Sequence, residues 1–222
     1  MATNFQLELD HTIEMLQREQ RVPTLLLHSC CAPCSSYVIE YLSRYFSITV
    51  FYYNPNIYPD EEYDKRVQEQ QEFIRRFPTE HPVDFIEGDF DKDAFYRMAK
   101  GLEQVKEGGE RCFGCYRLRL EETARLAAKL GCDYFTTTLS ISPLKNAAKL
   151  NEIGQELAQQ YGAPYLVSDF KKRNGYKRSV EISREYEMYR QDYCGCVFSK
   201  QEREQQKAEK EGQKDAEHLC AK

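Results

Sequence analysis

The chain has 222 residues, of which 41% are hydrophobic and 30% charged, and its formal net charge is -5 at pH 7. This length can bury one substantial core, and the composition is that of a soluble globular protein, not of a disordered or fibrous one. The acidic balance excludes indiscriminate nucleic-acid binding but allows a local basic patch. No apolar run approaches the ~20 residues of a membrane span, and the N-terminus has no apolar signal-peptide core, so we expect a cytoplasmic protein without membrane partners.

Taken in chain order, the first half of the sequence predicts alternating strands and helices. Residues 1–21 predict a short N-terminal helical extension, and the apolar run 24–28 predicts a buried strand. That strand leads into HSCCAPCSS and then a helix, for which Ser35 or Ser36 is the expected cap. Runs of β-branched and aromatic residues at 47–53 and 83–87 predict two more strands with a helix between them. This order predicts a parallel sheet with right-handed crossovers.

The second half continues the alternation and ends in a polar tail. Helices are predicted at 93–102 and 118–130, strands at 134–139 and 164–168, and a last domain helix at about 179–191. From residue 201 the chain is almost wholly charged and polar, which predicts a flexible tail, either a solvated helix or disordered. We therefore expect one α/β domain over residues 22–200, with a helical cysteine-containing C-terminal extension.

The nine cysteines of the chain are the strongest chemical signal. In a reducing compartment, grouped cysteines bind metals or carry out redox chemistry more often than they form structural disulfides. Two of them stand alone, Cys132 as an expected small buried residue and Cys220 as a tail residue. The other seven fall into three groups: Cys30 with Cys31 and Cys34, Cys112 with Cys115, and Cys194 with Cys196.

The first cysteine group follows a strand at the sheet edge where open parallel sheets bind ligands. The segments TTLSISPLKN and VSDFKKRNG leave predicted strands at the same edge, so we expect them to converge there. His28 directly precedes the cysteines. We interpret it as a strand-end histidine hydrogen-bonded to backbone, not as a ligand, because buried polar groups normally find such partners.

Two cysteine groups together would supply four thiolates, from Cys30, Cys31, Cys112 and Cys115. Four thiolates can hold a [4Fe-4S] cluster or a tetrahedral zinc ion. Adjacent residues rarely both bind one small ion without strain, so the vicinal pair favours the larger cluster. The nearby Cys34 is left either as a ligand of a second metal or as a residue without a role in the site.

The third group, Cys194 and Cys196, has two readings that the residues leave open. A Cys-Gly-Cys segment can form a strained disulfide, and strained disulfides are the labile, catalytic ones. Alternatively, both thiols complete a metal site.

Four segments carry a resemblance to a known family: HSCCAPCS, RCFGCYRLRL, TTLSISPLKN and FKKRNGYKRSVEIS followed by YRQDYCGCVFS. Over roughly residues 22–200 the sequence resembles the cobalamin-independent epoxyqueuosine reductases, the QueH family. The resemblance implies a Rossmann-like fold of the HUP group, a [4Fe-4S] cluster, and reduction of epoxyqueuosine to queuosine in tRNA, the last step of queuosine biosynthesis.

Carried over by position, the resemblance implies cluster ligands at Cys30, Cys31, Cys112 and Cys115 and a redox-active pair at Cys194 and Cys196. Some members are similar to this chain except for Asp at the position of Cys34, where an adjacent mononuclear iron is implied. Deoxygenating an epoxide takes two electrons and two protons, whereas the cluster passes one electron at a time. A dithiol would complete the electron count, an open iron site would polarise the epoxide oxygen, and an unidentified electron donor would be needed.

A basic segment follows the predicted fifth strand, and tRNA is the partner that would use it. Its cationic side chains are the candidate phosphate contacts, against the alternative of a solvated hinge: Lys171, Lys172, Arg173, Lys177 and Arg178. Two rival functions are an ATP-dependent PP-loop tRNA-modifying enzyme and a zinc-stabilised RNA-binding module. The first rival lacks support at its phosphate loop, because the first strand leads into CCAPCSS, which is not Gly-rich.

Overall fold

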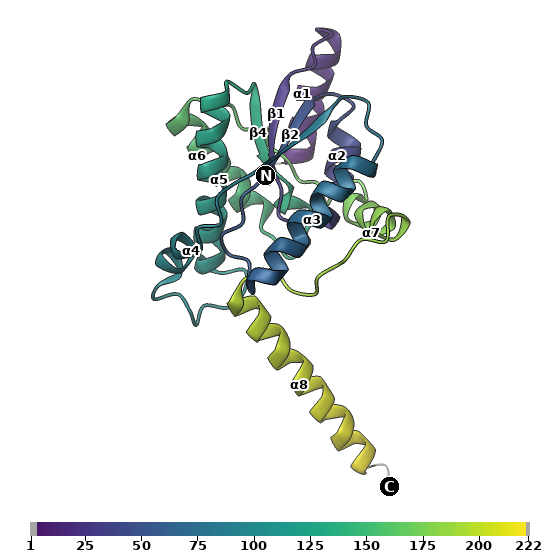
Figure 1. Ribbon diagram of the computed structural model, residues 1–222, viewed down its shortest axis with the longest axis vertical. Coiled ribbons are helices and arrows are strands. Elements are labelled where there is room, and N and C mark those ends of the chain that lie inside the picture. The colour runs from purple at the N-terminus through teal and green to yellow at the C-terminus, as the bar shows by residue number, and fades with distance from the viewer. Residues whose placement is uncertain (1–3, 221–222) are drawn as a thin grey trace.

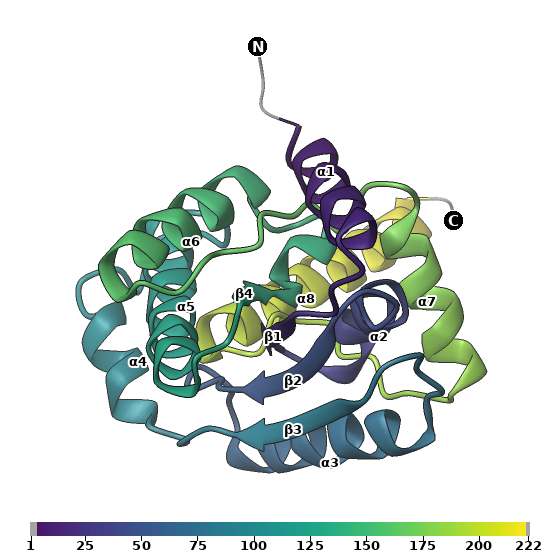
Figure 2. The ribbon, with the colours of Figure 1, turned by 90° about the horizontal axis from the view of Figure 1, so that it is seen from above.

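A four-stranded parallel sheet forms the centre of the protein. The computed structural model describes residues 4–220, with side chains described through residue 211. The sheet order is β3-β2-β1-β4, and each neighbouring pair is parallel (Figure 2). The strands are β1 (Thr24–His28), β2 (Ser47–Tyr52), β3 (Val83–Glu87) and β4 (Tyr134–Thr137). The predicted α/β class with a parallel sheet between helices is confirmed.

Helices cover both faces of the sheet. One face carries α1 (Phe5–Arg18), α2 (Ala32–Leu42), α3 (Asp60–Arg76) and α7 (Gly175–Glu185). The other carries α5 (Glu110–Leu130) and α6 (Ala147–Tyr161), with α4 (Lys92–Ala99) packed against α5. The last helix, α8 (Val197–Cys220), projects away from the body of the protein (Figure 1). The described helices include none that is both long enough and apolar enough to span a membrane.

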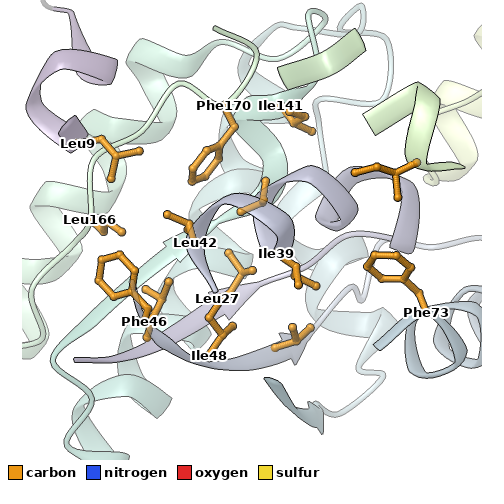
Figure 3. Close-up of a cluster of buried hydrophobic side chains, with 14 of the residues drawn as sticks. Leu9, Leu27, Ile39, Leu42, Phe46, Ile48, Phe73, Ile141, Leu166 and Phe170 are labelled. Carbon is orange, nitrogen blue, oxygen red and sulfur yellow. The ribbon is translucent and has the colours of Figure 1, made fainter. Parts of the chain in front are cut away.

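The two cores follow from the alternation of side chains along β1. Leu25 and Leu27 point into the core beneath α1 and α2, where Leu27 meets Ile39 and Leu42 (Figure 3). The intervening Leu26 points into the opposite core beneath α5 and α6. Successive strand residues point to opposite faces, so a continuous apolar run produces a strand buried on both sides.

The order of the strands reverses at β1: β2 and β3 are added on one side of it, and β4 on the other. The carboxyl ends of β1 and β4 therefore flank the point where strand order reverses. Ligands of open α/β sheets bind outside such a point. The backbone N-H of Cys30, after β1, points to Thr138 Oγ1, after β4, at 3.4 Å. The expected meeting of these two segments is therefore confirmed.

The predicted fifth strand at 164–168 is wrong: only one parallel bridge forms, between Phe135 and Tyr165. The segment does run beside β4, and the N-H of Leu166 donates to the carbonyl of Phe135. Pairing then stops because the side chain of Asn151 occupies both backbone groups of Ser168, at 2.9 Å each. A buried amide on α6 thus replaces a strand neighbour.

Three predicted helix starts are also wrong. α7, predicted at about 179–191, spans Gly175–Glu185, and the other two errors involve the cysteine segments. α2 begins at Ala32, before the serines expected to cap it, because Pro33 suits the first turn of a helix. α5 begins at Glu110 instead of residue 118, so both cysteines of RCFGCYR are helical. Its end matches the prediction, with Gly131 in the left-handed conformation at φ 66°.

The C-terminal segment takes the helical form of the two that its composition allowed. Near its start, α8 packs against α4 and α5 through Phe198. Arg203 and Lys207 both pair with Asp192, in the segment before α8. Cys220 is the last residue of this helix, but its side chain lies outside the described side chains, as does the rest of the tail beyond residue 211.

Candidate functional site

The first cysteine loop is held rigidly between β1 and α2. Gln70, on the buried face of α3, accepts hydrogen bonds from Ser29 at 2.7 Å and from Ser35 at 2.9 Å. Asn54, which follows β2, donates to the carbonyl of Ser29 at 2.8 Å. Three elements therefore fix the backbone on both sides of the vicinal cysteines.

This loop brings three thiols together. The sulfurs of Cys30, Cys31 and Cys34 all lie within 4.8 Å of one another, a group that could hold a metal ion. Cys31 occupies the N-cap position of α2, and Cys34 lies three residues further on, so the helical repeat puts both on one side. The structure therefore joins Cys34 to the pair, where the sequence left it as a neighbour with an open role.

Local charges and hydrogen bonds favour an anionic sulfur in this group. Contacts with the thiols of Cys30 and Cys34 lower the pKa of Cys31 well below its usual range, and nearby Arg66 lowers it further. Gln191 also donates to Cys31 Sγ at 2.9 Å. The same thiol contacts raise the pKa of Cys34. A thiol with a lowered pKa is readily present as the thiolate, the form of cysteine that binds metals. Metal binding would displace the protons of the other thiols.

The second cysteine group lies on α5. Cys112 and Cys115 are three residues apart on the buried face of this helix, which continues through Tyr116 and Arg119. Burial raises the pKa of the Cys115 thiol to about 12. Burial also raises that of Cys112, although the N-H of Gly108 donates to its sulfur at 3.3 Å. A bound metal would have to displace these protons.

The third cysteine group, Cys194 and Cys196, lies in a turn at Gly195 that places both residues beside the second group. Gly195 has φ 128°, a conformation that side chains rarely adopt, and a Cβ there would lie 2.9 Å from Arg66 Nη1. Its carbonyl accepts from the N-H of Tyr58 at 2.8 Å. Glycine is therefore required between Cys194 and Cys196 for the chain to turn here and present both thiols.

Two adjoining cavities connect the three groups through Cys194, although Cys31 lines neither cavity and neither is lined by both the first and the second group. The larger, about 310 Å³, is lined by Cys30, Cys34 and Cys194 among others. The smaller, between α5 and the start of α8, is lined by the cysteines of the second and third groups: Cys112, Cys115, Cys194 and Cys196. Cys194, Glu107, Lys145 and Arg119 line both cavities. Segments more than 160 positions apart in the sequence thus converge on one composite site.

Buried cations at this site escaped the sequence reasoning. Arg66 and Arg119 are 2% and 1% exposed, and each has one guanidinium nitrogen without a hydrogen-bond partner among the described atoms. Burial opposes the charge of Arg119, but the neighbouring thiols, first Cys115 and then Cys194, raise its pKa. Its position four residues after Cys115 was the available signal, because i and i+4 share a helix face.

Lys145 and Glu107 were not among the site residues predicted from the sequence, although Lys145 lies in the segment TTLSISPLKN. The Lys145 ammonium is 3.0 Å from Glu107 and 2.9 Å from Cys194 Sγ. Arg111 also lines the smaller cavity, where its charge partly offsets the rise in the pKa of Cys196 that burial causes. It donates to the carbonyl of Glu103 at 2.9 Å and to Glu202 at 3.0 Å, which ties α8 to the loop before α5.

Most of the basic segment is neutralised within the protein. Lys171 pairs with Asp169, and Arg173 pairs with Asp10 of α1. Arg178 makes a bidentate contact with Glu40 of α2, at 2.7 and 3.1 Å, and also binds Glu185. Lys172 is exposed and makes no ion pair with a described side chain, and Lys177 lies 4.0 Å from Glu181. Only these two lysines therefore offer readily available charge.

His28 has the structural role expected of it. Its Nε2 lies 3.2 Å from the carbonyl of Tyr53 and its Nδ1 lies 2.8 Å from Thr137 Oγ1. A carbonyl only accepts, so Nε2 carries a hydrogen. Burial lowers the pKa of His28 from 6.5 to about 3, so the ring is neutral at pH 7.

We expect this buried ring to make the fold sensitive to acid. Between those two pH values the unfolded chain binds a proton that the folded chain does not, so stability falls as pH drops below 6.5. From pH 7.5 to 5.0, the wild type should lose about 2 kcal/mol more unfolding free energy than His28→Gln. Anaerobic urea unfolding of both proteins measures this difference, and parallel pH profiles would contradict it.

Comparison with known proteins now adds to this geometry. The family described as "Epoxyqueuosine reductase QueH" matches residues 25–202. A protein of that name from Streptococcus pyogenes serotype M1 is 43% identical over 198 residues, covering 88% of this chain and 78% of the relative. Another, from Thermotoga maritima, is 35% identical over 192 residues, covering 84% of this chain and 95% of the relative. The chain therefore belongs to the epoxyqueuosine reductase QueH family.

Proposed function

We propose that this protein reduces epoxyqueuosine to queuosine in tRNA, as its family membership indicates. The observation that best supports the chemistry is the convergence of three cysteine groups on two adjoining cavities lined with buried cations. Thiols at such a site can hold a metal cofactor and store electrons. The larger cavity, about 310 Å³, is within the size range of small-ligand sites and would admit the modified end of the base.

The cofactor of this proposal is a [4Fe-4S] cluster held by Cys30, Cys31, Cys112 and Cys115. The residues suit it in kind, because thiolates are its usual ligands and the buried Arg66 and Arg119 would offset its negative charge. Such a cluster supplies electrons one at a time. Cys34 is close enough to Cys30 and Cys31 to bind an adjacent mononuclear iron as a second cofactor.

Cys194 and Cys196 supply the two-electron capacity. When both thiols are oxidised to one disulfide, they release two electrons and two protons. The epoxide takes up the same number when both its C-O bonds break, the C=C bond forms and the oxygen leaves as water. An electron donor, not yet identified, must then reduce the disulfide before the next turnover.

We propose that only two residues of the basic segment, Lys172 and Lys177, contact tRNA phosphates. Lys172→Glu combined with Lys177→Glu should weaken tRNA binding. It should also make the fall of log affinity with log salt concentration less steep, by about 1 in slope for each lost phosphate contact. The paired Arg178 provides the matched control, since Arg178→Gln should alter stability and leave the salt slope unchanged. Equilibrium binding at several salt concentrations measures this. An unaltered slope in the double variant would place the phosphate contacts elsewhere.

The deciding experiment is anaerobic incubation of the purified protein with epoxyqueuosine-containing tRNA and dithionite, followed by nucleoside mass analysis. We expect conversion of epoxyqueuosine to queuosine, with no change to tRNA lacking the modification. The anaerobic protein should be brown, with a broad visible band that dithionite bleaches. A colourless protein with stoichiometric zinc and no conversion would sink the proposal.

A further inference from the structure

Lys145 is an unusual side chain for its position. It lies in the turn between β4 and α6, where lysines normally reach solvent, yet its side chain is only 7% exposed. Its ammonium lies between two groups, Glu107 Oε1 at 3.0 Å and Cys194 Sγ at 2.9 Å. Burying a lysine is costly unless its charge is paired, so these two contacts account for its position.

The two cysteines of the third group have different surroundings. Cys194 lines both cavities and faces the Lys145 ammonium. Cys196 lines only the smaller of the two, is 8% exposed, and contacts Ser199 in the first turn of α8. Burial raises the pKa of the Cys196 thiol. A pair that looks symmetrical in the sequence is therefore asymmetrical in the fold.

The charge of Lys145 is secure despite its burial. Burial opposes the ammonium form, but Cys194, Tyr116 and Glu107 together raise the pKa of Lys145 well above its ordinary value. A fixed ammonium beside a sulfur stabilises negative charge on that sulfur. The thiolate is the form of cysteine that reacts.

We infer that Lys145, oriented by Glu107, makes Cys194 the reactive thiol of the pair, with Cys196 as the thiol that completes the disulfide. The inference rests on the proposed function, in which this dithiol supplies two electrons and two protons for each epoxide. Lys145 is a positioning residue in this scheme: it touches the sulfur of Cys194 and acts through it. The larger cavity then presents Cys194, and not Cys196, to the substrate side.

The test is the rate at which iodoacetamide alkylates each cysteine in the anaerobic, reduced full-length protein, followed by peptide mass spectrometry. Lys145→Met should slow alkylation of Cys194 by about tenfold. The rates at Cys196 and at the half-buried, solitary Cys132 should stay within about twofold of wild type. Lys145→Arg keeps the charge and should restore most of the Cys194 rate. Lys149→Met, which removes a partly exposed lysine one turn further on, should change none of the three rates.

A second neutral variant guards against a folding artefact. Lys145→Gln retains a hydrogen-bond donor without the charge, and should show the same selective loss at Cys194. If Cys194 reacts at the wild-type rate in both neutral variants, the inference is overturned. Nucleoside analysis of the same proteins separates the two proposals. If the neutral Lys145 variants lose reactivity selectively at Cys194 but the wild type cannot convert epoxyqueuosine, only the proposed function is refuted. If the wild type converts epoxyqueuosine but the alkylation rate of Cys194 does not depend on Lys145, only this inference is refuted.

Discussion

A Cys196→Ser variant should lose multiple turnover of epoxyqueuosine-containing tRNA by at least ~100-fold, because a single thiol cannot store the electron pair. The substitution is structurally mild. Cys196 Sγ accepts the N-H of Ser199 at 3.4 Å and so caps α8, and serine is a better N-cap residue than cysteine. Loss of activity could then not be attributed to a lost helix cap. Nucleoside analysis over several turnovers, with an excess of tRNA, measures the effect.

The matched control is Cys132→Ser, which removes a half-buried cysteine outside the three groups and should keep full activity. The visible band of Cys196→Ser should match the wild type, because the proposed cluster ligands are intact. If this variant turns over tRNA at the wild-type rate, the dithiol has no part in the reaction and electrons reach the epoxide by another route.

Replacing Arg119 by methionine should have opposite effects on the protein with and without bound metal. Arg119 forms no salt bridge with a carboxylate among the described residues, and the ionisable groups that act on it are Cys115, Cys194, Cys30 and Tyr116. With thiolates bound to a metal, removal of this cation leaves buried negative charge uncompensated, at a cost of about 3 kcal/mol or more. With neutral thiols, the wild type instead holds an unpaired buried cation, so Arg119→Met should be neutral or stabilising.

Iron content and anaerobic urea unfolding, each before and after chelation, would reveal this reversal of sign. Arg125→Met serves as the control on the same helix, because Arg125 is exposed and its loss should change unfolding by less than about 0.5 kcal/mol in either state. Destabilisation of equal size with and without metal would mean that Arg119 supports only packing, through its bonds to Cys115 and Asn54.

Two strands were readable from local pattern alone. The boundaries of β1 and β3 match the predicted runs. β1 is a continuous apolar run and is buried between the two helical layers, whereas β3 is an edge strand whose β-branched and aromatic residues are only partly buried. The end of α5 at Gly131 was equally local, since a left-handed C-cap needs only glycine at that position. The three cysteine groups were also visible, as spacing within short segments.

The missing fifth strand shows where local pattern fails. Residues 164–168 have strand composition, but Asn151, in a different helix, takes the backbone groups that would have continued the pairing. Local pattern also misleads at the basic segment, where it offered all five cationic side chains as candidate phosphate contacts. Arg178 reads as a surface cation until Glu40, 138 positions earlier, is found opposite it. Each outcome depends on a partner that is distant in the sequence.

What the sequence by itself determined was the grouping of the thiols and the motifs that mark the family, because cysteine spacing is local. Only the tertiary structure decided which thiols face which cavity and which cations accompany them. Lys145 and Arg119 look like ordinary charged residues in the sequence. Arg119 lies on α5 and Lys145 directly precedes α6, two helices that pack on the same face of the sheet. Both side chains are buried there, and a charge acts most strongly on a neighbouring group when both are removed from water.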